Sequence, residues 1–305
     1  MQEELWNLPP PDKLPMLNTH DEMTQISHIK MPHPLTEQEF EKLRLLLSVY
    51  QDGFGMLALK NGLSMPGWRD FERAVAVALG GSPPKGKGKE SREGKNVFDV
   101  IVPITSEVHK GISCKMRGEL DRTLNKDKRV SMELSNSAKY FWKYLETKGI
   151  DHDNYRKKAQ EVGNALIDLV TSWHNKESTA VGGKVNLDES SYLVLSWNKK
   201  GDYQLHQFSL HLPNPRDLTW SFPFKKKSKE ERDSLCGNDT SGTLFEWYGE
   251  SGGQLKYFPL EEDAVWKSPI FQLEPLPLGE YGLLAKVKQY FPMQWKETED
   301  LVEEK

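Results

Sequence analysis

The sequence predicts a mixed α/β (α+β) protein whose first part alternates helices with strands and whose second part is rich in strands. Up to about residue 174, apolar residues recur at helical spacing in four segments, with runs rich in β-branched residues between them. Beyond Gly182-Gly183 the pattern changes to an alternation of apolar and polar residues, which is typical of antiparallel strands. No internal repeat is present, and the order of elements is not that of a doubly wound dinucleotide-binding fold.

Composition excludes several classes of protein. The 305 residues include 9 Trp, 10 Tyr and 12 Phe, enough to fill a core, so a wholly disordered chain is excluded. No apolar run approaches the roughly 20 residues that cross a bilayer, and MQEELWNLPPPDK lacks the features of a signal peptide. Cys114 and Cys236 are too few for a disulfide framework or a cysteine-rich zinc site. We therefore expect a soluble, cytoplasmic protein with no membrane partner.

Charge is segregated along the chain. The formal net charge of −4 argues against a sequence-blind nucleic-acid coat, which is normally basic. From His109 to Lys148, however, ten Lys and Arg stand against five Asp and Glu. One basic cleft on an otherwise acidic surface is therefore compatible with DNA binding.

Two helices are predicted after an amino-terminal arm. The arm, residues 1–34, is interrupted by Pro9, Pro10, Pro11, Pro15, Pro32 and Pro34. A capping box at Thr36 and Glu39 predicts a helix over 36–49, whose apolar positions are Phe40, Leu43, Leu46 and Leu47. Gly67 opens the second helix, which places Phe71, Val75 and Leu79 on one side and stops at Gly80-Gly81.

Three strands and two further helices follow. The stretch 82–96, SPPKGKGKESREGKN, is predicted to be a mobile basic loop. Strands are predicted over 97–104, 109–117 and 128–134. Ser135 is a good N-cap for a helix that contains Phe141, Trp142 and Leu145, and another helix covers about 153–174.

Four antiparallel strands are predicted in the second part, with Pro-rich and Gly-rich turns between them. They cover 191–197, 203–212, 243–249 and the stretch around 264–273.

Common catalytic motifs are absent. SPPKGKGKE matches neither the P-loop nor the dinucleotide-binding pattern, and no H-E-x-x-H or G-x-S-x-G occurs. The eight His residues show no metal-ligand spacing. His206 and His211 lie five residues apart, on opposite faces of a strand, and are interpreted as structural.

Three charged residues form a candidate constellation for phosphodiester hydrolysis. Asp99 lies in a hydrophobic strand, Lys115 in the next strand, and Glu72 on the helix before both. Carboxylates hold Mg²⁺, which activates water, and a lysine orients that water or offsets charge on the phosphate. The alternative interpretations are a turn-capping Asp99, a snorkelling surface Lys115 and a solvated Glu72.

These segments, GWRDFERAVAVALGG, NVFDVIVP, GISCKMR and RVSMELSNSAKYFWKYL, resemble the PD-(D/E)XK nuclease core, and more narrowly the type II restriction endonucleases. The resemblance covers about residues 67–147. It implies a restriction-endonuclease-like mixed sheet flanked by helices, with Asp99 as the metal-binding Asp, Lys115 as the motif lysine and Glu72 as the accessory helix acid.

The sequence departs from the family pattern at one position. The motif's second acid stands two residues before the lysine, where this chain has Ser113. A subgroup of the family carries S-x-K and supplies the carboxylate from a later helix. Glu133, at the junction of the strand RVSMEL and its helix, is the candidate ligand, and Glu119 is nearer in sequence but lies in the GELDR turn. If neither acid reaches the metal, the chain is a one-carboxylate variant or a decayed nuclease. Cys114, between Ser113 and Lys115, is expected to point into the core.

Candidate DNA contacts follow the catalytic strand. Arg117, Arg122, Arg129, Lys139 and Lys143 are candidates for phosphate binding. Arg117 and Arg122 are alternatively candidates for guanine readout, and each of these residues is otherwise an ordinary solvated charge. Asn136 and Ser137 either donate to phosphate or cap the helix.

The sequence therefore predicts three regions: an N-terminal arm and helix (1–66), a nuclease core (67–180), and a β-rich portion for recognition or dimerisation that is continuous with the core (181–305). The expected function is Mg²⁺-dependent hydrolysis of double-stranded DNA at a specific sequence. A homodimer is expected because a symmetric cut needs two active sites, and a cognate DNA methyltransferase is expected genetically. The alternatives are a repair- or structure-specific nuclease and a catalytically decayed DNA-binding protein.

Overall fold

The computed structural model describes residues 31–59, 63–83, 97–135, 137–225, 230–276 and 283–303, which all belong to one compact unit, Met31–Lys305. Most of the predicted arm and of the predicted loop 82–96 lies outside these residues, as does Asn136. The described residues form helices and three sheets, so the mixed α+β class is confirmed.

The largest sheet has six strands and is built around the predicted strand 109–117. Its order is β12-β7-β6-β4-β3, with β13 also paired to β7. The strands are β3 (Val100–Pro103), β4 (His109–Arg117), β6 (Ser191–Trp197), β7 (Asp202–Ser209), β12 (Trp266–Lys267) and β13 (Phe271–Gln272). β4 and β6 run parallel, whereas the other pairs are antiparallel.

A second, five-stranded sheet is antiparallel throughout, in the order β5-β11-β10-β9-β8. Its strands are β5 (Met132–Ser135), β8 (Thr219–Ser221), β9 (Leu235–Asp239), β10 (Gly242–Trp247) and β11 (Leu255–Tyr257). A two-stranded sheet pairs β1 (Leu57–Ala58) with β2 (Ser64–Met65). The two large sheets thus exchange strands, because β5 precedes β6 in the chain yet pairs with strands that follow β7.

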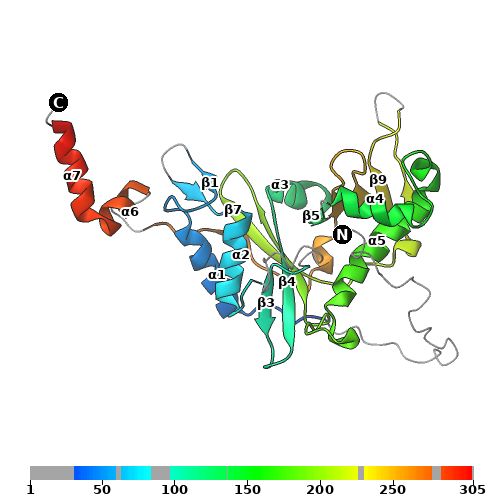
Figure 1. Ribbon diagram of the computed structural model, residues 1–305, viewed down its shortest axis with the longest axis horizontal. Coiled ribbons are helices and arrows are strands. Elements are labelled where there is room, and N and C mark those ends of the chain that lie inside the picture. Colours follow the sequence, from blue (N-terminus) through cyan, green and yellow to red (C-terminus); the bar gives the residue numbers. More distant parts are fainter. Residues whose placement is uncertain are drawn as a thin grey trace, which may run out of the picture. The chain divides into compact units, whose positions relative to one another are not determined.

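Two helices cover one face of the six-stranded sheet, α1 (Glu37–Val49) and α2 (Trp68–Ala78) (Figure 1). Thr36 and Glu39 form the predicted capping box of α1. Leu43 and Phe71 are buried against sheet residues such as Val100 and Leu195. The apolar spacing that predicts these helices therefore marks the faces that they bury.

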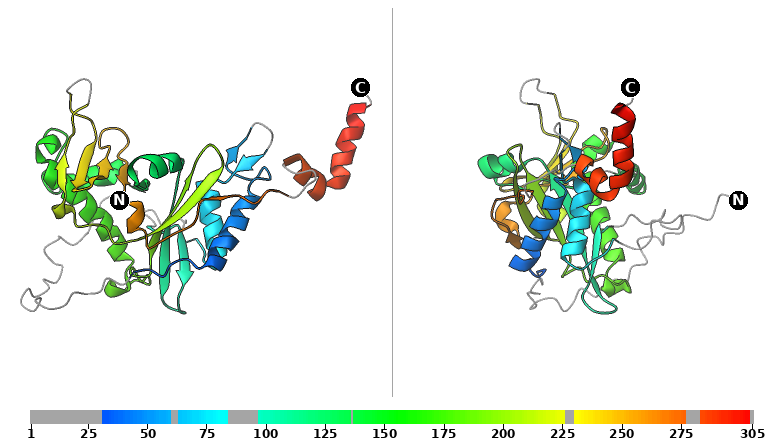
Figure 2. Two further views of the ribbon diagram at one scale, coloured as in Figure 1. Left: turned by 180° about the vertical axis from the view of Figure 1, so that it is seen from behind. Right: turned by 90° about the vertical axis from the view of Figure 1, so that its left-hand side faces the viewer.

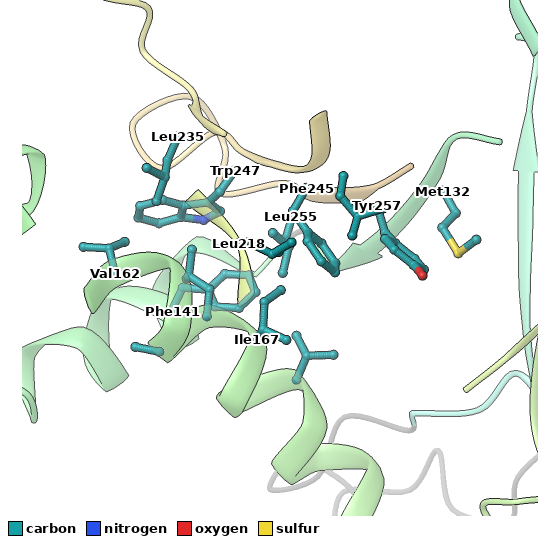
Figure 3. Close-up of a cluster of buried hydrophobic side chains, with 14 of the residues drawn as sticks. Met132, Phe141, Val162, Ile167, Leu218, Leu235, Phe245, Trp247, Leu255 and Tyr257 are labelled. Carbon is teal, nitrogen blue, oxygen red and sulfur yellow. The ribbon is translucent and has the colours of Figure 1, made fainter. Parts of the chain in front are cut away.

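On the opposite face, α5 (Ala159–Lys176) lies against β6 through His174 and Tyr192. α4 (Ala138–Glu146) packs on α5, which also contacts the five-stranded sheet (Figures 1 and 2). Figure 3 shows part of this second core, where Phe141, Phe245 and Trp247 meet. Burial of one such large side chain contributes about 1.5–3 kcal/mol. Gly163 of α5 lies against the Trp220 ring, and a Cβ there would stand 2.0 Å from Trp220 Cδ2. Only glycine permits this close approach of α5 to β8.

The remaining elements are short or lie near the carboxyl terminus. They are α3 (Leu120–Arg122) with a π-helical turn (Thr123–Asp127), α6 (Leu283–Tyr290), α7 (Pro292–Glu303), and 3₁₀ turns at Tyr155–Lys158, Thr179–Val181, Pro215–Asp217 and Glu261–Asp263. Across the described ranges, none of the helices has the length and apolar character needed to span a bilayer.

Several predicted bounds are wrong. The strand predicted over 97–104 begins only at Val100, and the strand predicted over 128–134 begins at Met132. Ser135 pairs with Leu255 as the last residue of β5, so Ser137 is the N-cap of α4. The helix predicted from 153 begins at Ala159 because a 3₁₀ turn precedes it. Helices α6 and α7 lie in a region that was expected to be β-rich.

Arg129 is buried at the junction of β5 with the rest of the five-stranded sheet. Its side chain is 5% exposed, and its guanidinium donates to Phe258 O at 2.6 Å and to Ser241 Oγ at 2.5 Å. It also donates to Asp239 Oδ1 at 3.3 Å. The guanidinium thus makes three hydrogen bonds inside the fold, which gives Arg129 a structural role, while its role as a DNA contact stays a prediction.

Replacing Arg129 by Ala should lower the free energy of unfolding by about 3 kcal/mol, because the buried acceptors lose their charged donor. Urea denaturation at pH 7 measures this change. Arg122→Ala is the matched control, since Arg122 is 40% exposed and exposed ion pairs contribute at most about 1 kcal/mol. Equal losses in the two variants would contradict a structural role for Arg129.

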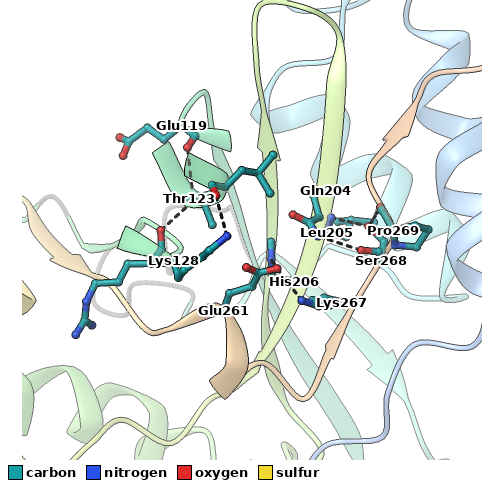
Figure 4. A network of polar contacts seen from close by, with 12 residues as sticks. Glu119, Thr123, Lys128, Gln204, Leu205, His206, Glu261, Lys267, Ser268 and Pro269 are labelled. Carbon is teal, nitrogen blue, oxygen red and sulfur yellow. Dashed lines mark hydrogen bonds and ion pairs between the residues drawn. The ribbon is translucent and has the colours of Figure 1, made fainter. Parts of the chain in front are cut away.

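His206 is fully buried on β7, next to an ion pair between Glu261 and Lys267 (Figure 4). Its Nε2 lies 4.0 Å from Glu261 Oε1, and within the described residues neither ring nitrogen has a hydrogen-bond partner. Burial lowers the pKa of His206 to about 4. The imidazole is therefore neutral at pH 7, in agreement with its predicted structural role.

Acid should destabilise the fold through His206. Between pH 6.5 and 4 the unfolded chain binds a proton that the folded chain does not, so the free energy of unfolding falls as the pH falls. The contribution of this group is roughly 3 kcal/mol over that window. Denaturation curves at pH 7 and pH 4.5 should show a smaller difference for His206→Phe than for the wild type. His211→Phe, at an exposed histidine that pairs with Asp188, should keep most of the wild-type difference.

Candidate functional site

A pocket of about 270 Å³ lies where the six-stranded sheet, β5 and α5 meet. Four of the predicted catalytic residues line it: Asp99, Ser113, Lys115 and Glu133. The other lining residues, which sequence reasoning missed, are Val97, Leu134, Ser135, Val170, Trp173, His174 and Tyr192.

The alternation of β4 directs Ser113 and Lys115 into this pocket. Successive side chains of a strand point to opposite faces, so Cys114 points the other way and is buried in the core beneath α2. The parallel register places Ser113 opposite Tyr192 and Lys115 opposite Val194 of β6. The orientation expected for Cys114 is therefore confirmed.

Asp99 lies directly before β3 rather than inside a strand. Its backbone N–H still donates to Ile112 O at 2.9 Å, and its Oδ2 accepts from the Cys114 N–H at 2.8 Å. A carboxylate that accepts a backbone N–H is held in one orientation, and it keeps further lone pairs for other partners. The strand edge thus fixes Asp99 at the pocket.

Glu133 reaches the pocket from the other sheet and forms an ion pair there. Its Oε2 lies 3.0 Å from a guanidinium nitrogen of Arg117, and both side chains are about one quarter exposed. Arg117 is on β4 and Glu133 on β5, so this pair links the two large sheets. The predicted DNA contact Arg117 and the predicted metal ligand Glu133 are therefore partners of each other.

Glu72 and Glu119 lie elsewhere. Glu72, half-buried on α2, is not among the lining residues. Its helix packs on the face of β4 that carries Cys114, and burial, followed by the charges of Asp99 and Glu72, raises the pKa of the Cys114 thiol. Glu119 pairs with Arg122 at 3.2 Å.

His174 and Tyr192 form the buried floor of the pocket. The Tyr192 hydroxyl and His174 Nε2 are 3.3 Å apart, and the Phe98 ring stacks on the imidazole. Burial, together with the charge of Lys115, lowers the pKa of His174 to about 4, so the imidazole is neutral at pH 7. The only sequence signal for this residue is its position one helical turn after Val170.

The remaining DNA-binding candidates lie outside the pocket. Arg122 pairs with Glu119 and with Asp127. Lys139 and Lys143 are exposed on α4, four residues apart and hence on one side of the helix. Ser137 is the N-cap of that helix.

Asp99 and Glu133 are the two carboxylates that line the pocket, and proteins usually hold Mg²⁺ through one or two carboxylates while it keeps several waters. The described residues contain no group of three or more His, Cys, Asp or Glu side chains that could hold a metal ion. A cation held there by Asp99 and Glu133 alone would have to keep most of its water ligands.

Family models, curated proteins and solved structures give no match to this chain. The functional interpretation therefore rests on the pocket and its residues.

Removing the guanidinium of Arg117 should strengthen cation binding in the pocket. In Arg117→Ala the carboxylate of Glu133 loses its competing cation, and a pair of this exposure is worth up to about 1 kcal/mol, or roughly fivefold in affinity. Calorimetric titration with Mn²⁺ in the absence of DNA measures the change. Arg122→Ala should leave the affinity unchanged. An unchanged affinity in Arg117→Ala would remove Glu133 from the set of metal ligands.

Proposed function

We propose that this protein is a Mg²⁺-dependent endonuclease of the type II restriction class, which hydrolyses double-stranded DNA at a specific sequence. One observation carries the proposal. Asp99, the β4 residues Ser113 and Lys115, and Glu133 of β5 come from three segments of the chain and line one pocket. The resemblance to the PD-(D/E)XK family assigns chemistry to these same residues, including Glu133 as the replacement for the acid missing at Ser113.

The pocket residues have complementary roles in the hydrolysis. Water forms a new bond to phosphorus, and one ester P–O bond breaks. The Lys115 amino group orients the attacking water and offsets the negative charge that develops on the phosphate oxygens. The Ser113 hydroxyl, on the same face of β4, is placed to donate to one of those oxygens.

Asp99 and Glu133 would hold the metal ion. A bound Mg²⁺ supplies a more acidic water and neutralises charge on the phosphate. Asp99 is fixed by the Cys114 N–H, whereas Glu133 must release Arg117 or share its carboxylate between the guanidinium and the ion. Glu72 is assigned no part in this scheme because it does not line the pocket.

DNA contacts and assembly are further parts of the proposal. Arg117, the partner of the pocket residue Glu133, together with the exposed Lys139 and Lys143 of α4, offers positive charge to phosphates. A symmetric cut of duplex DNA needs two such pockets related by a two-fold axis, so the active form is proposed to be a homodimer. It would act in the cytoplasm beside a DNA methyltransferase that protects the host sites.

Purified protein should cut phage-sized duplex DNA into discrete bands with Mg²⁺ and not with EDTA. Lys115→Ala should lower the rate by about 10²- to 10³-fold, because it removes an electrostatic group at the reacting phosphate. Lys110→Ala is the matched control. Lys110 lies at the other end of the same strand and does not line the pocket.

The other outcomes separate the alternatives. A smear that requires both Mg²⁺ and Lys115 would indicate a repair- or structure-specific nuclease. Binding of DNA without any cutting, across many substrates, would indicate a catalytically decayed DNA-binding protein. Cutting that survives Lys115→Ala would reject the pocket as the active site.

A further inference from the structure

The pocket has two unlike walls. One wall carries the polar residues Asp99, Ser113, Lys115 and Glu133. The apolar and aromatic wall consists of Val170, Trp173 and His174 on α5, and it is extended by Val97, which precedes Asp99 in the chain, and by Tyr192 of β6, which lies beside Ser113. A phosphodiester needs only the polar wall. The apolar and aromatic wall therefore points to a second, flat and poorly hydrated group attached to the phosphate.

Burial differs along the apolar wall. Val170, His174 and Tyr192 are buried and close the floor, whereas Trp173 and Val97 are partly exposed at the rim. The Trp173 ring touches Phe141 at a centroid distance of 5.7 Å, and the indole also lines the pocket. Packing against Phe141 holds the indole in position for a ring that enters from solvent.

The third side of the pocket is the edge strand of the five-stranded sheet. β5 is the first strand in the order of that sheet, and β11 pairs with it on one side. Glu133, Leu134 and Ser135 of β5 line the pocket. An edge strand presents backbone N–H and C=O groups, which are suitable partners for the polar edge of a heterocycle.

The volume limits what can enter. About 270 Å³ lies just below the range of roughly 300–1,000 Å³ that is usual for small-molecule sites. Two paired bases with their two sugar–phosphate strands need more room than this volume offers, so a stacked base pair does not fit. A single nucleotide, with one phosphate and one base, matches both the size and the two walls.

We propose that the pocket receives one deoxynucleotide whose base has left the stack, with its phosphate at Lys115 and Ser113 and its base against Trp173. This inference rests on the proposed nuclease function and names its substrate: DNA that is unpaired at the cleaved position, or a duplex from which one nucleotide is extruded. Aromatic side chains stack on any base because every base has a π-face. Enzymes that extrude a nucleotide hold it in a pocket of this kind.

The first test uses small probes and needs no cleavage. Deoxyadenosine 5′-monophosphate and 2-deoxyribose 5-phosphate share the sugar and the phosphate and differ by the base. With Ca²⁺ present, calorimetry on the full-length protein should show the nucleotide binding about tenfold more tightly. Equal affinities, or no binding of the nucleotide, would overturn the inference without any recourse to variants.

Variants then assign the contacts. Trp173→Ala should abolish the tenfold preference for the nucleotide, and Trp173→Phe should keep most of it because an aromatic face remains. Lys115→Ala should weaken both probes equally, since both carry the phosphate. A preference that persists in Trp173→Ala would overturn the assignment of the base to α5.

A DNA substrate separates this inference from the proposed function. Once a cut position is mapped, removing the base opposite the cleaved nucleotide should raise kcat/KM about tenfold, since an unpaired base costs less to extrude. Removing the base of the cleaved nucleotide itself should lower kcat/KM, because the contact of that base with Trp173 is lost. A kcat/KM that is the same for both altered substrates as for the unaltered DNA would overturn the inference without contradicting the nuclease function. Failure to cleave any DNA, with the base preference of the probes intact, would reject only the nuclease function.

Discussion

The parallel pairing of β4 with β6 determines where the pocket lies. Two parallel neighbours cannot be joined by a tight turn and need a long crossover connection. Here the crossover contains β5, α4 and α5, and these elements return over the face of β4 that carries Ser113 and Lys115. This crossover between β4 and β6 therefore also supplies Glu133 of β5 and the α5 residues Val170, Trp173 and His174 to the pocket. Gly163 completes this arrangement, since it lets α5 pack closely on Trp220 of the second sheet.

The ion pair between Arg117 and Glu133 makes the charge of the pocket depend on what is bound. Arg117 neutralises Glu133 when the pocket holds no ligand. An anion that binds Arg117 competes with that carboxylate and so favours a cation at Glu133. Binding linkage is reciprocal, so the cation favours the anion by the same factor. A phosphate and a metal ion would thus strengthen each other's binding, even though each alone has to compete with a side chain.

Local patterns in the sequence are sufficient to predict β4, β6 and α1, and also the order Glu72, Asp99, Ser113, Lys115. Strand alternation is sufficient to place Lys115 and Cys114 on opposite faces. The pairing of β5 with β11 is not predictable in this way. The local pattern of residues 128–135 indicates a strand but does not indicate which distant strand, more than a hundred residues later, it pairs with. For the same reason, Tyr192 and His174 could not be assigned to the site, because the apolar residues around each of them in the sequence indicate only a buried core position. The position of Arg129 in a basic segment likewise does not indicate that its guanidinium is buried and hydrogen-bonded to Phe258 O and Asp239 Oδ1.

The exchange of strands between the two large sheets has a consequence for how such a protein can change over generations. β5, from the earlier part of the chain, belongs to the five-stranded sheet, whereas β6 and β7, from the later part, belong to the six-stranded sheet. A recombination event between residues 135 and 191 would therefore join fragments whose sheets lack their partners. Neither half can be inherited as an exchangeable module. Variation has to arise through point substitutions and altered loop lengths within one intact gene, because the two sheets cannot be exchanged separately.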